Sequence, residues 1–190
     1  CARLECSELT TNKTFWWCEL DLKGLIRDVP DYPSEGILFR DLTPVMADPR
    51  AMQYITETLS NRLRSLNVEA LAAIDSRGFI FGAPITAALD IPFIPIRKAG
   101  KLPPPVVGVD YSLEYGSARL EMTTNAVEKG QRVGIVDDLL ATGGSAGAAV
   151  KLVTELGAEV VSIAFLVELE FLNGRSILPN SVDVFSMVKY

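Results

Sequence analysis

The sequence predicts an α/β fold in which a mainly parallel, twisted sheet is flanked by helices. Two patterns support this prediction: short, continuously apolar runs typical of buried parallel strands, and amphipathic runs of helical period between them. The two patterns alternate along the chain, which favours right-handed crossovers between parallel strands. With 190 residues, 48% of them hydrophobic, the chain has the length of one well-buried domain.

The N-terminal part does not show this alternation. Residues 1–18 lack periodicity and contain all three cysteines, whose spacing fits neither a metal site nor a disulfide framework. We expect them to be a disordered or non-native extension. The segment that follows ends in "VPDYP", whose prolines stop any helix. Residues from about 19 to 45 are therefore expected to form a small N-terminal hood on a core of residues 46–190.

The core begins with an amphipathic helix. Asp48 is a candidate N-cap followed by proline, and apolar residues recur from 52 to 66 at spacings of three and four. The patterns that follow predict a strand at 70–74, a short helix at 82–90 with Pro84 near its start, and a strand at 93–96.

A stretch rich in glycine, proline and lysine interrupts the pattern at 98–108. We expect a long, mobile loop there, which is a candidate lid and leads into two alternating strands. The α/β alternation then resumes with a buried strand at 132–136, a helix from about 146 that Gly157 ends, and a strand at 159–167.

Composition excludes several functions. A net charge of −6 without any basic run argues against nucleic acid as a partner. No apolar stretch approaches the roughly 20 residues that span a bilayer, so we expect no membrane association and a cytoplasmic location. The absence of histidine excludes Ser-His and Cys-His nucleophile pairs and His-ligated metals.

The stretch "VGIVDDLLATGGS" (133–145) joins an apolar strand to two acids and a small polar turn. Ligands of such sheets bind at the carboxyl ends of the strands. The small residues after the acids allow backbone N–H groups to converge on an anion at the start of the next helix. They are Ala141, Thr142, Gly143, Gly144 and Ser145, of which Thr142 and Ser145 add hydroxyl donors. This pattern predicts a site for one phosphate monoester.

Asp137 and Asp138 beside such a site suit a vicinal diol, because carboxylates accept strongly from hydroxyl groups. The stretch then predicts a holder for a ribose 5-phosphate. It is not a Walker A loop, since no lysine follows the glycines, and the dinucleotide G-x-G-x-x-G pattern is also absent. The structural alternative is a solvated Asp-Asp turn that caps the next helix.

This stretch and five others together resemble the type I phosphoribosyltransferases, and in particular their adenine-using members. The five are "PDYPSEGILFRDLTPVMADP", "AAIDSRGFIFG", "PIRKAGKLP", "YSLEYG" and "LVELEFLNGR", in family order over residues from about 22 to 190. The resemblance implies that family's fold and transfer of the 5-phosphoribosyl group from phosphoribosyl pyrophosphate (PRPP) to N9 of adenine, giving AMP and pyrophosphate. It also implies Mg²⁺ bound mainly through PRPP, with no protein metal ligand, and a homodimer.

The segment "DSRGF" resembles the family's pyrophosphate loop. The resemblance implies a non-proline cis peptide between Asp75 and Ser76, which turns backbone amides toward the leaving group. Arg77 would then be a forked donor to pyrophosphate. The alternative for Arg77 is a surface residue that caps the next helix.

Residues 97–116 correspond to the family's mobile loop, which reaches toward the neighbouring subunit. Arg97 and Lys101 would neutralise pyrophosphate as the C1′–O bond breaks. Glu114 and Tyr115 would reach the reaction centre when the loop closes, Glu114 in an acid–base or charge-stabilising role. A solvated, charged loop is the alternative.

The segment "GILFRD" resembles the family's adenine-binding segment. Phe39 would stack on the purine, Leu38 and Arg40 would present backbone groups to its Watson–Crick edge, and Leu169 would close the far side. Phe39 as an ordinary core residue is the alternative. The sequence departs from the family pattern at Ser145, where Thr is usual, and at Ala99, where a basic residue can occur.

Two further functions stay open on the sequence. One is a non-catalytic sensor of PRPP or nucleotides on the same fold, which has no need of Arg97, Lys101 and Glu114 together. The other is an enzyme of the same kind acting on guanine, xanthine or orotate, against which the segment "GILFRD" argues.

Overall fold

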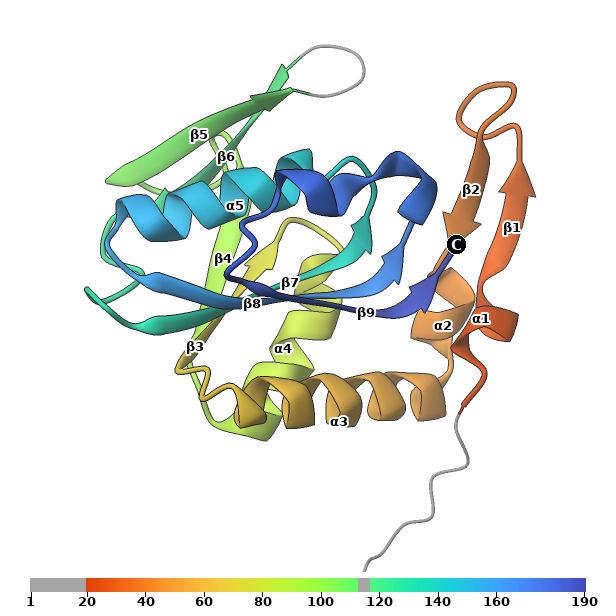
Figure 1. Cartoon of the computed structure of the whole chain (residues 1–190), viewed down its shortest axis with the longest axis horizontal. Coiled ribbons are helices and arrows are strands. Elements are labelled where there is room, and N and C mark those ends of the chain that lie inside the picture. The colour runs from red at the N-terminus through yellow and green to blue at the C-terminus, as the bar shows by residue number, and fades with distance from the viewer. Residues whose placement is uncertain (1–19, 113–116) are drawn as a thin grey trace, which may run out of the picture.

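A computed structural model describes residues 20–112 and 117–190, and a seven-stranded sheet with the order β5-β6-β4-β3-β7-β8-β9 lies at its centre (Figure 1). Five strands pair in parallel: β4 (Phe93–Lys98), β3 (Ala70–Ile74), β7 (Arg132–Leu140), β8 (Glu159–Glu168) and β9 (Asp183–Lys189). Strands β5 (Val106–Ser112) and β6 (Ser117–Thr123) pair with each other antiparallel, and β6 pairs antiparallel with β4. The predicted α/β fold with a mainly parallel sheet is confirmed.

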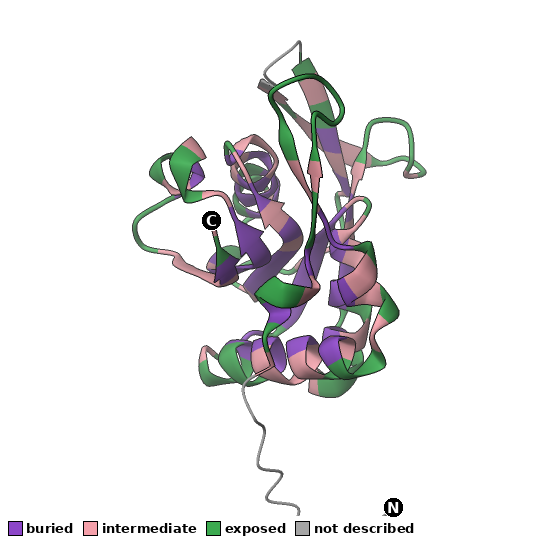
Figure 2. Ribbon diagram, turned by 90° about the vertical axis from the view of Figure 1, so that its right-hand side faces the viewer, coloured by how far each residue is buried: buried purple, intermediate pink, exposed green. Residues whose placement is uncertain are grey.

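Helices cover both faces of the sheet. Helices α3 (Pro49–Ser65) and α4 (Gly78–Leu89) lie on one face, and α5 (Gly144–Glu155) lies on the other (Figure 1). Alternate residues of β3 join two different apolar clusters, one with α5 and one with α3 and α4. Because both faces are covered, the strand is apolar throughout. Figure 2 shows the buried residues concentrated in the central strands and on the helix surfaces that face them.

A second, two-stranded sheet stands apart from the first (Figures 1 and 2). It consists of β1 (Arg27–Pro30) and β2 (Leu38–Asp41), which pair antiparallel, with α1 (Leu22–Leu25) before it and α2 (Thr43–Ala47) after it. Asp41 accepts hydrogen bonds from the backbone N–H of Thr43 at 2.9 Å and from its hydroxyl at 2.8 Å. These bonds satisfy a donor at the start of α2. The prolines of "VPDYP" thus lie in a β-hairpin.

Several predicted elements are confirmed. The carboxylate of Asp48 caps α3 by accepting from the N–H of Arg50 at 2.8 Å. The predicted strands at 70–74, 93–96 and 159–167 are β3, β4 and β8. Helix α5 is followed by Gly157 in the left-handed region, at φ +86°.

Three predicted boundaries are wrong. The helix expected at 82–90 begins at Gly78, and Pro84 lies inside it, since proline keeps a helical φ and removes only one hydrogen bond. The strand expected at 132–136 continues to Leu140 because β8 offers it partners as far as Glu168, so both acids lie within the strand. The long loop expected at 98–108 is confined to residues 99–105, since β4 extends to Lys98 by pairing with β6, and β5 begins at Val106.

The C-terminal elements were not predicted. Two short 3₁₀ helices, η1 (Glu170–Leu172) and η2 (Gly174–Ile177), connect β8 to β9. None of the helices in the described part of the chain is both long enough and apolar enough to cross a membrane. Residues 1–18 with their cysteines, and the predicted site residues Glu114 and Tyr115, lie outside the described residues.

Candidate active site

Polar residues gather where β3 and β7 end. The last residue pair between these strands is Ala73 and Val136, so Asp75 and Asp137 follow at nearly the same level. Asp75 and Ser76 are joined by a non-proline cis peptide, as predicted. Arg77 comes next and leads into α4.

A glycine brings α4 against the acidic end of β7. A Cβ atom added at Gly78 would lie 2.9 Å from the carbonyl oxygen of Val136 and 3.1 Å from Oδ1 of Asp137. Only glycine allows the helix to start this close to the strand. No residue pattern predicted a role for Gly78, although it lies in the quoted segment "DSRGF".

This approach places Arg77 beside the acid pair. Its Nε lies 2.8 Å from Oδ2 of Asp138, whose residue is only 4% exposed. This contact is an ion pair, and no donor among the described residues forms a hydrogen bond to that oxygen. Asp137 accepts at Oδ1 from the backbone N–H of Asp138 at 2.9 Å. Asp138 therefore keeps an acceptor oxygen that has a cation beside it but lacks a hydrogen-bond donor.

The surroundings of the pair disfavour two negative charges. Burial raises the pKa of Asp137 well above its ordinary range, and the charge of Asp138 raises it further. Burial also raises the pKa of Asp138, against the opposing effect of Arg77. A ligand that donates hydroxyl protons or carries positive charge would relieve this cost.

The predicted phosphate loop surrounds a small cavity of about 70 Å³ at the start of α5. Gly143 precedes the helix with φ +85°, a conformation that favours glycine. All five predicted loop residues line the cavity together with Asp137, and so does Tyr111 of β5. Sequence analysis missed Tyr111, although it lies in the quoted segment "YSLEYG". The helix start supplies unpaired N–H groups and a positive dipole end to this cavity.

Arg97, one of the predicted lid residues, contacts the segment that is predicted to bind pyrophosphate. Nε of Arg97 donates to Oδ2 of Asp75 at 2.9 Å, and Nη1 of Arg97 donates to the carbonyl oxygen of Lys101 at 3.3 Å. Lys101 itself is exposed. The structure thus brings Arg97, Lys101 and Asp75 together.

A second cavity, of about 340 Å³, lies between the β1–β2 hairpin, α2 and the start of α4. Phe39 lines it, with its ring edge-on to Tyr32 at 5.2 Å between centroids. Arg77 lines it as well, so this cavity adjoins the ion pair with Asp138. Its remaining lining residues are Arg27, Val29, Asp41, Leu42, Thr43 and Met46. The sequence did not single these out, although Thr43 and Met46 belong to the quoted segment that contains Phe39.

The other three predicted base-site residues are not among those that line this cavity. Leu38 is 46% exposed, and Leu169 packs against the apolar cluster that includes α3 and α4. The side chain of Arg40 forms an ion pair with Asp28 and lies over the ring of Tyr190, 3.7 Å from its centroid. This placement leaves only the backbone of Arg40 for the predicted role.

Comparison with known proteins first identifies the protein family that the chain resembles. Residues 44–187 match the family model described as "Phosphoribosyl transferase domain". The adenine phosphoribosyltransferase of Synechococcus sp. (strain RCC307) is 49% identical over 172 residues, which cover 90% of this chain and 97% of that protein.

Solved structures agree with the sequence comparison. The adenine phosphoribosyltransferase of Thermoanaerobacter pseudethanolicus superposes with a TM-score of 0.85 at 48% identity, covering 89% of this chain and 98% of that one. That of Saccharomyces cerevisiae, complexed with D-2,5-dideoxy-2,5-imino-altritol 1,6-bisphosphate and adenine, gives 0.83 at 40% identity and covers 87% of this chain and 96% of its own. The chain therefore belongs to the phosphoribosyltransferase family and, within it, to the adenine phosphoribosyltransferases.

Proposed function

We propose that this protein transfers the 5-phosphoribosyl group from PRPP to N9 of adenine, giving AMP and pyrophosphate in purine salvage. One observation carries the proposal beyond family membership. Arg77 lines the cavity that holds Phe39 and also pairs with Asp138, while Asp137 lines the phosphate-loop cavity. The base cavity, the acid pair and the phosphate cavity are thus arranged in the same order as the base, the ribose and the phosphate of AMP.

The sugar phosphate occupies the end of β7 in this proposal. Residues 141–145 bind the 5′-phosphate through backbone N–H groups and the hydroxyls of Thr142 and Ser145. Asp137 and Asp138 accept from the 2′- and 3′-hydroxyls. Their raised pKa values support this role, because hydroxyl donors stabilise the charged form that burial disfavours.

The leaving group lies toward β3 and β4. The C1′–O bond to pyrophosphate breaks as the C1′–N9 bond forms, and negative charge develops on the pyrophosphate oxygens. Arg77, Arg97 and Lys101, with the backbone around Asp75 and Ser76, stabilise that charge. The pairing of Arg97 with Asp75 and with the carbonyl of Lys101 supports this grouping.

The base occupies the cavity beside the β1–β2 hairpin, where Phe39 offers an aromatic face. The backbone of Leu38 and Arg40 presents donors and acceptors to the Watson–Crick edge, and Leu169 closes the far side. The N9 proton leaves as the new bond forms, and Glu114, with Tyr115 beside it, serves the acid–base or charge-stabilising role on closure.

The residues of the site fit Mg²⁺ as a cofactor. No group of three or more metal-ligating side chains occurs among residues 20–112 and 117–190. Asp137 and Asp138 nevertheless offer carboxylate oxygens, and one of them, on Asp138, is buried without a hydrogen-bond donor. Mg²⁺ favours oxygen ligands and usually keeps waters and substrate phosphates. The ion would be held mainly by oxygens of PRPP, and the carboxylates of Asp137 and Asp138 would lie outside its direct ligands. It would neutralise negative charge on the diphosphate.

Assembly and location complete the proposal. We expect a homodimer, because the family's mobile loop reaches toward the neighbouring subunit, and sedimentation of the purified protein tests this. A cytoplasmic location also stays a prediction, to be checked by fractionation of cells that express the full chain.

The test of the activity is a panel of bases with PRPP and Mg²⁺, with products followed by chromatography. Adenine should give AMP and pyrophosphate in equal amounts, much faster than hypoxanthine or guanine react. Faster turnover of either of those bases would overturn the assignment of adenine. Turnover of no base, with PRPP still bound, would instead support the non-catalytic sensor.

The diol assignment has its own test in the double variant Asp137→Asn/Asp138→Asn. Because it removes charge-assisted hydrogen bonds, each worth roughly 1.5–3 kcal/mol, PRPP binding measured by calorimetry should weaken strongly. Adenine binding should change little. Unchanged PRPP affinity would show that the two acids do not hold the ribose.

A further inference from the structure

The connection between β8 and β9 forms an outer wall of the phosphate loop. A Cβ atom added at Gly174 would lie 2.2 Å from the carbonyl oxygen of Ala141, and one added at Gly143 would lie 2.4 Å from the carbonyl oxygen of Gly174. The two backbones therefore touch with no room for a side chain. A shift of the backbone at Gly174 toward the loop would therefore displace the loop.

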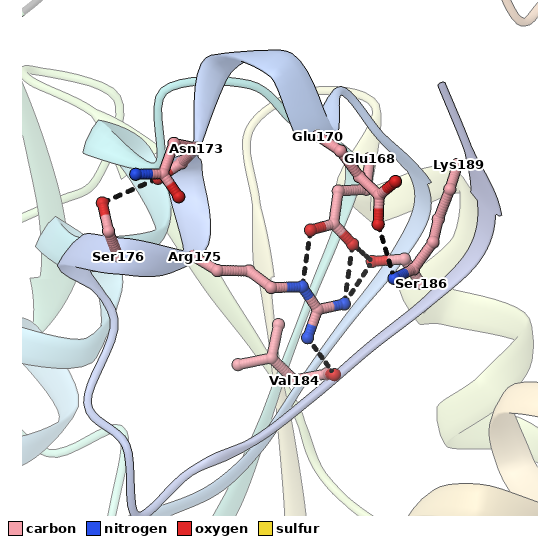
Figure 3. A network of polar contacts seen from close by, with 8 residues as sticks. All are labelled: Glu168, Glu170, Asn173, Arg175, Ser176, Val184, Ser186 and Lys189. Atoms are coloured by element: carbon pink, nitrogen blue, oxygen red, sulfur yellow. Dashed lines mark hydrogen bonds and ion pairs between the residues drawn. The ribbon is translucent and has the colours of Figure 1, made fainter.

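Arg175 fixes this connection to both C-terminal strands (Figure 3). Its Nε and Nη2 donate to the two carboxylate oxygens of Glu168 at 2.5 and 2.6 Å, and its Nη1 donates to the carbonyl oxygen of Val184 at 2.7 Å. The hydroxyl of Ser186 donates to Glu168 at 2.7 Å. Arg175 thereby ties the end of β8 to β9 through three side-chain donors.

Glu168 is well placed to relay this restraint. It is 3% exposed and pairs across the sheet with Leu140, the last residue of β7 before the phosphate loop. The hydrogen bonds from Arg175 hold the pKa of Glu168 below its usual range, so the carboxylate stays charged. A planar guanidinium matches a carboxylate with two parallel bonds, which the point charge of lysine cannot reproduce.

We propose that Arg175 and Glu168 are positioning residues for the 5′-phosphate loop: they hold the connection 170–177 against residues 141–145 and so set the direction of the loop N–H groups. This rests on the proposed function, in which that loop binds the phosphate of PRPP. Neither residue touches the substrate. Their contribution is to the geometry of the anion site, where hydrogen bonds to phosphate weaken when the N–H groups no longer point at its oxygens.

The test compares Arg175→Lys with Arg62→Lys in the full chain. Arg62 is a matched control, since it too makes a two-pronged contact to a carboxylate, that of Asp183, the first residue of β9. We expect Arg175→Lys to raise the PRPP KM and the dissociation constant of ribose 5-phosphate about ten- to hundredfold, the effect of losing one charge-assisted hydrogen bond to phosphate, with kcat at saturating PRPP and the adenine KM nearly unchanged. Arg62→Lys should behave like the wild type.

A second pair of variants keeps the test decisive if Arg175→Lys does not fold, which melting curves will show. Gly174→Ala pushes the wall into the loop while leaving the pair of Arg175 and Glu168 in place, and it should weaken ribose 5-phosphate binding similarly. Gly147→Ala, where the nearest atom to the added Cβ is 3.5 Å away, should bind it normally. If Arg175→Lys folds and binds ribose 5-phosphate normally, the positioning role is overturned. If Arg175→Lys does not fold, normal binding of ribose 5-phosphate by Gly174→Ala overturns it instead.

The variant Gly143→Ala, which displaces the backbone of the loop itself, separates this inference from the function on which it rests. If it binds ribose 5-phosphate as well as the wild type does, the loop is not the phosphate site and both ideas fail. If it binds more weakly while Arg175→Lys and Gly174→Ala bind normally, only the positioning role fails.

Discussion

Gly143 offers the sharpest test of the phosphate loop, because replacement by alanine has two separable costs. The first is conformational: Gly143 has φ +85°, where a Cβ atom is unfavourable. The second is steric, since the new atom would meet the carbonyl oxygen of Gly174 at 2.4 Å and Cγ1 of Ile177 at 2.9 Å. Gly157, at the other end of α5, has φ +86°, and its nearest atom to a Cβ is 3.5 Å away. Gly157→Ala thus carries the first cost alone.

The magnitudes follow from these contacts. A left-handed alanine costs roughly 1–2 kcal/mol, which lowers the melting temperature by about 2–4 °C per kcal/mol in a chain of this size. Both variants should show this loss. The contact at Gly143 falls 0.6 Å short of the 3.0 Å that Cβ atoms keep (3.0 − 2.4), so the loop or its wall must move by about that much. A shift of this size should reduce PRPP affinity about ten- to hundredfold, the effect of losing one charge-assisted hydrogen bond of roughly 1.5–3 kcal/mol.

Calorimetric titration of PRPP and of adenine into both variants measures the difference. Gly143→Ala should lose PRPP affinity and keep its affinity for adenine, whereas Gly157→Ala should bind both normally despite its lower melting temperature. If Gly143→Ala bound PRPP as tightly as Gly157→Ala does, the backbone of residues 141–145 could not be the phosphate site.

Three further predictions concern charge and the base. Asp137→Asn should raise the melting temperature at pH 7. Because the pKa of Asp137 is raised in the folded protein, the wild type loses stability as the pH rises from the ordinary aspartate range through the raised value. The amide of asparagine does not titrate, so the variant does not lose this stability. A melting temperature below that of the wild type across this range would refute it. Phe39→Ala should raise the adenine KM by about tenfold or more, because stacking of a base is worth roughly 1–3 kcal/mol. The PRPP KM should hold, and Ile80→Ala, at an apolar residue of α4 that is 43% exposed, is the control. Glu168→Gln should be less stable than the wild type at pH 7 by about 1–3 kcal/mol. That deficit should shrink in acid denaturation curves, since stability from a depressed pKa is lost as pH falls through the folded value.

The sequence predicted β3 and β8 almost to the residue but did not predict β9 at one edge of the sheet. Strands β3 and β8 are covered on both faces, so their apolar character is continuous and visible. Strand β9 lies at the edge, is mostly half-buried and mixes polar with apolar residues, which hides it. The continuation of β7 through Asp137 and Asp138 depends on backbone partners that β8 supplies, and no side-chain pattern records such partners.

The candidate site divides in the same way. Two acids followed by small residues are a local signal, and local chemistry sufficed to predict a sugar-phosphate holder at residues 137–145. The ion pairs between Arg77 and Asp138 and between Arg97 and Asp75 join residues 61 and 22 positions apart, which the strand order alone brings together. No sequence pattern predicted a role for Arg175. What distinguishes its partner Glu168 from an exposed glutamate is burial, and burial of this residue cannot be read from the sequence.

These two ion pairs bear on how PRPP could enter the site. Each arginine expected to hold pyrophosphate is paired, in the structure, with an acid of the same site: Arg77 with Asp138, and Arg97 with Asp75. A buried charge stripped of its partner is costly. In the proposed complex the diphosphate replaces carboxylate at the arginines, while the ribose hydroxyls replace guanidinium at Asp138. Binding of PRPP is then an exchange of ion-pair partners in which every buried charge keeps a polar partner. This holds only if the sugar and the diphosphate bind together, as parts of one molecule. Ribose 5-phosphate or pyrophosphate alone completes only half of the exchange, so the two fragments together should bind more weakly than the intact PRPP that joins them.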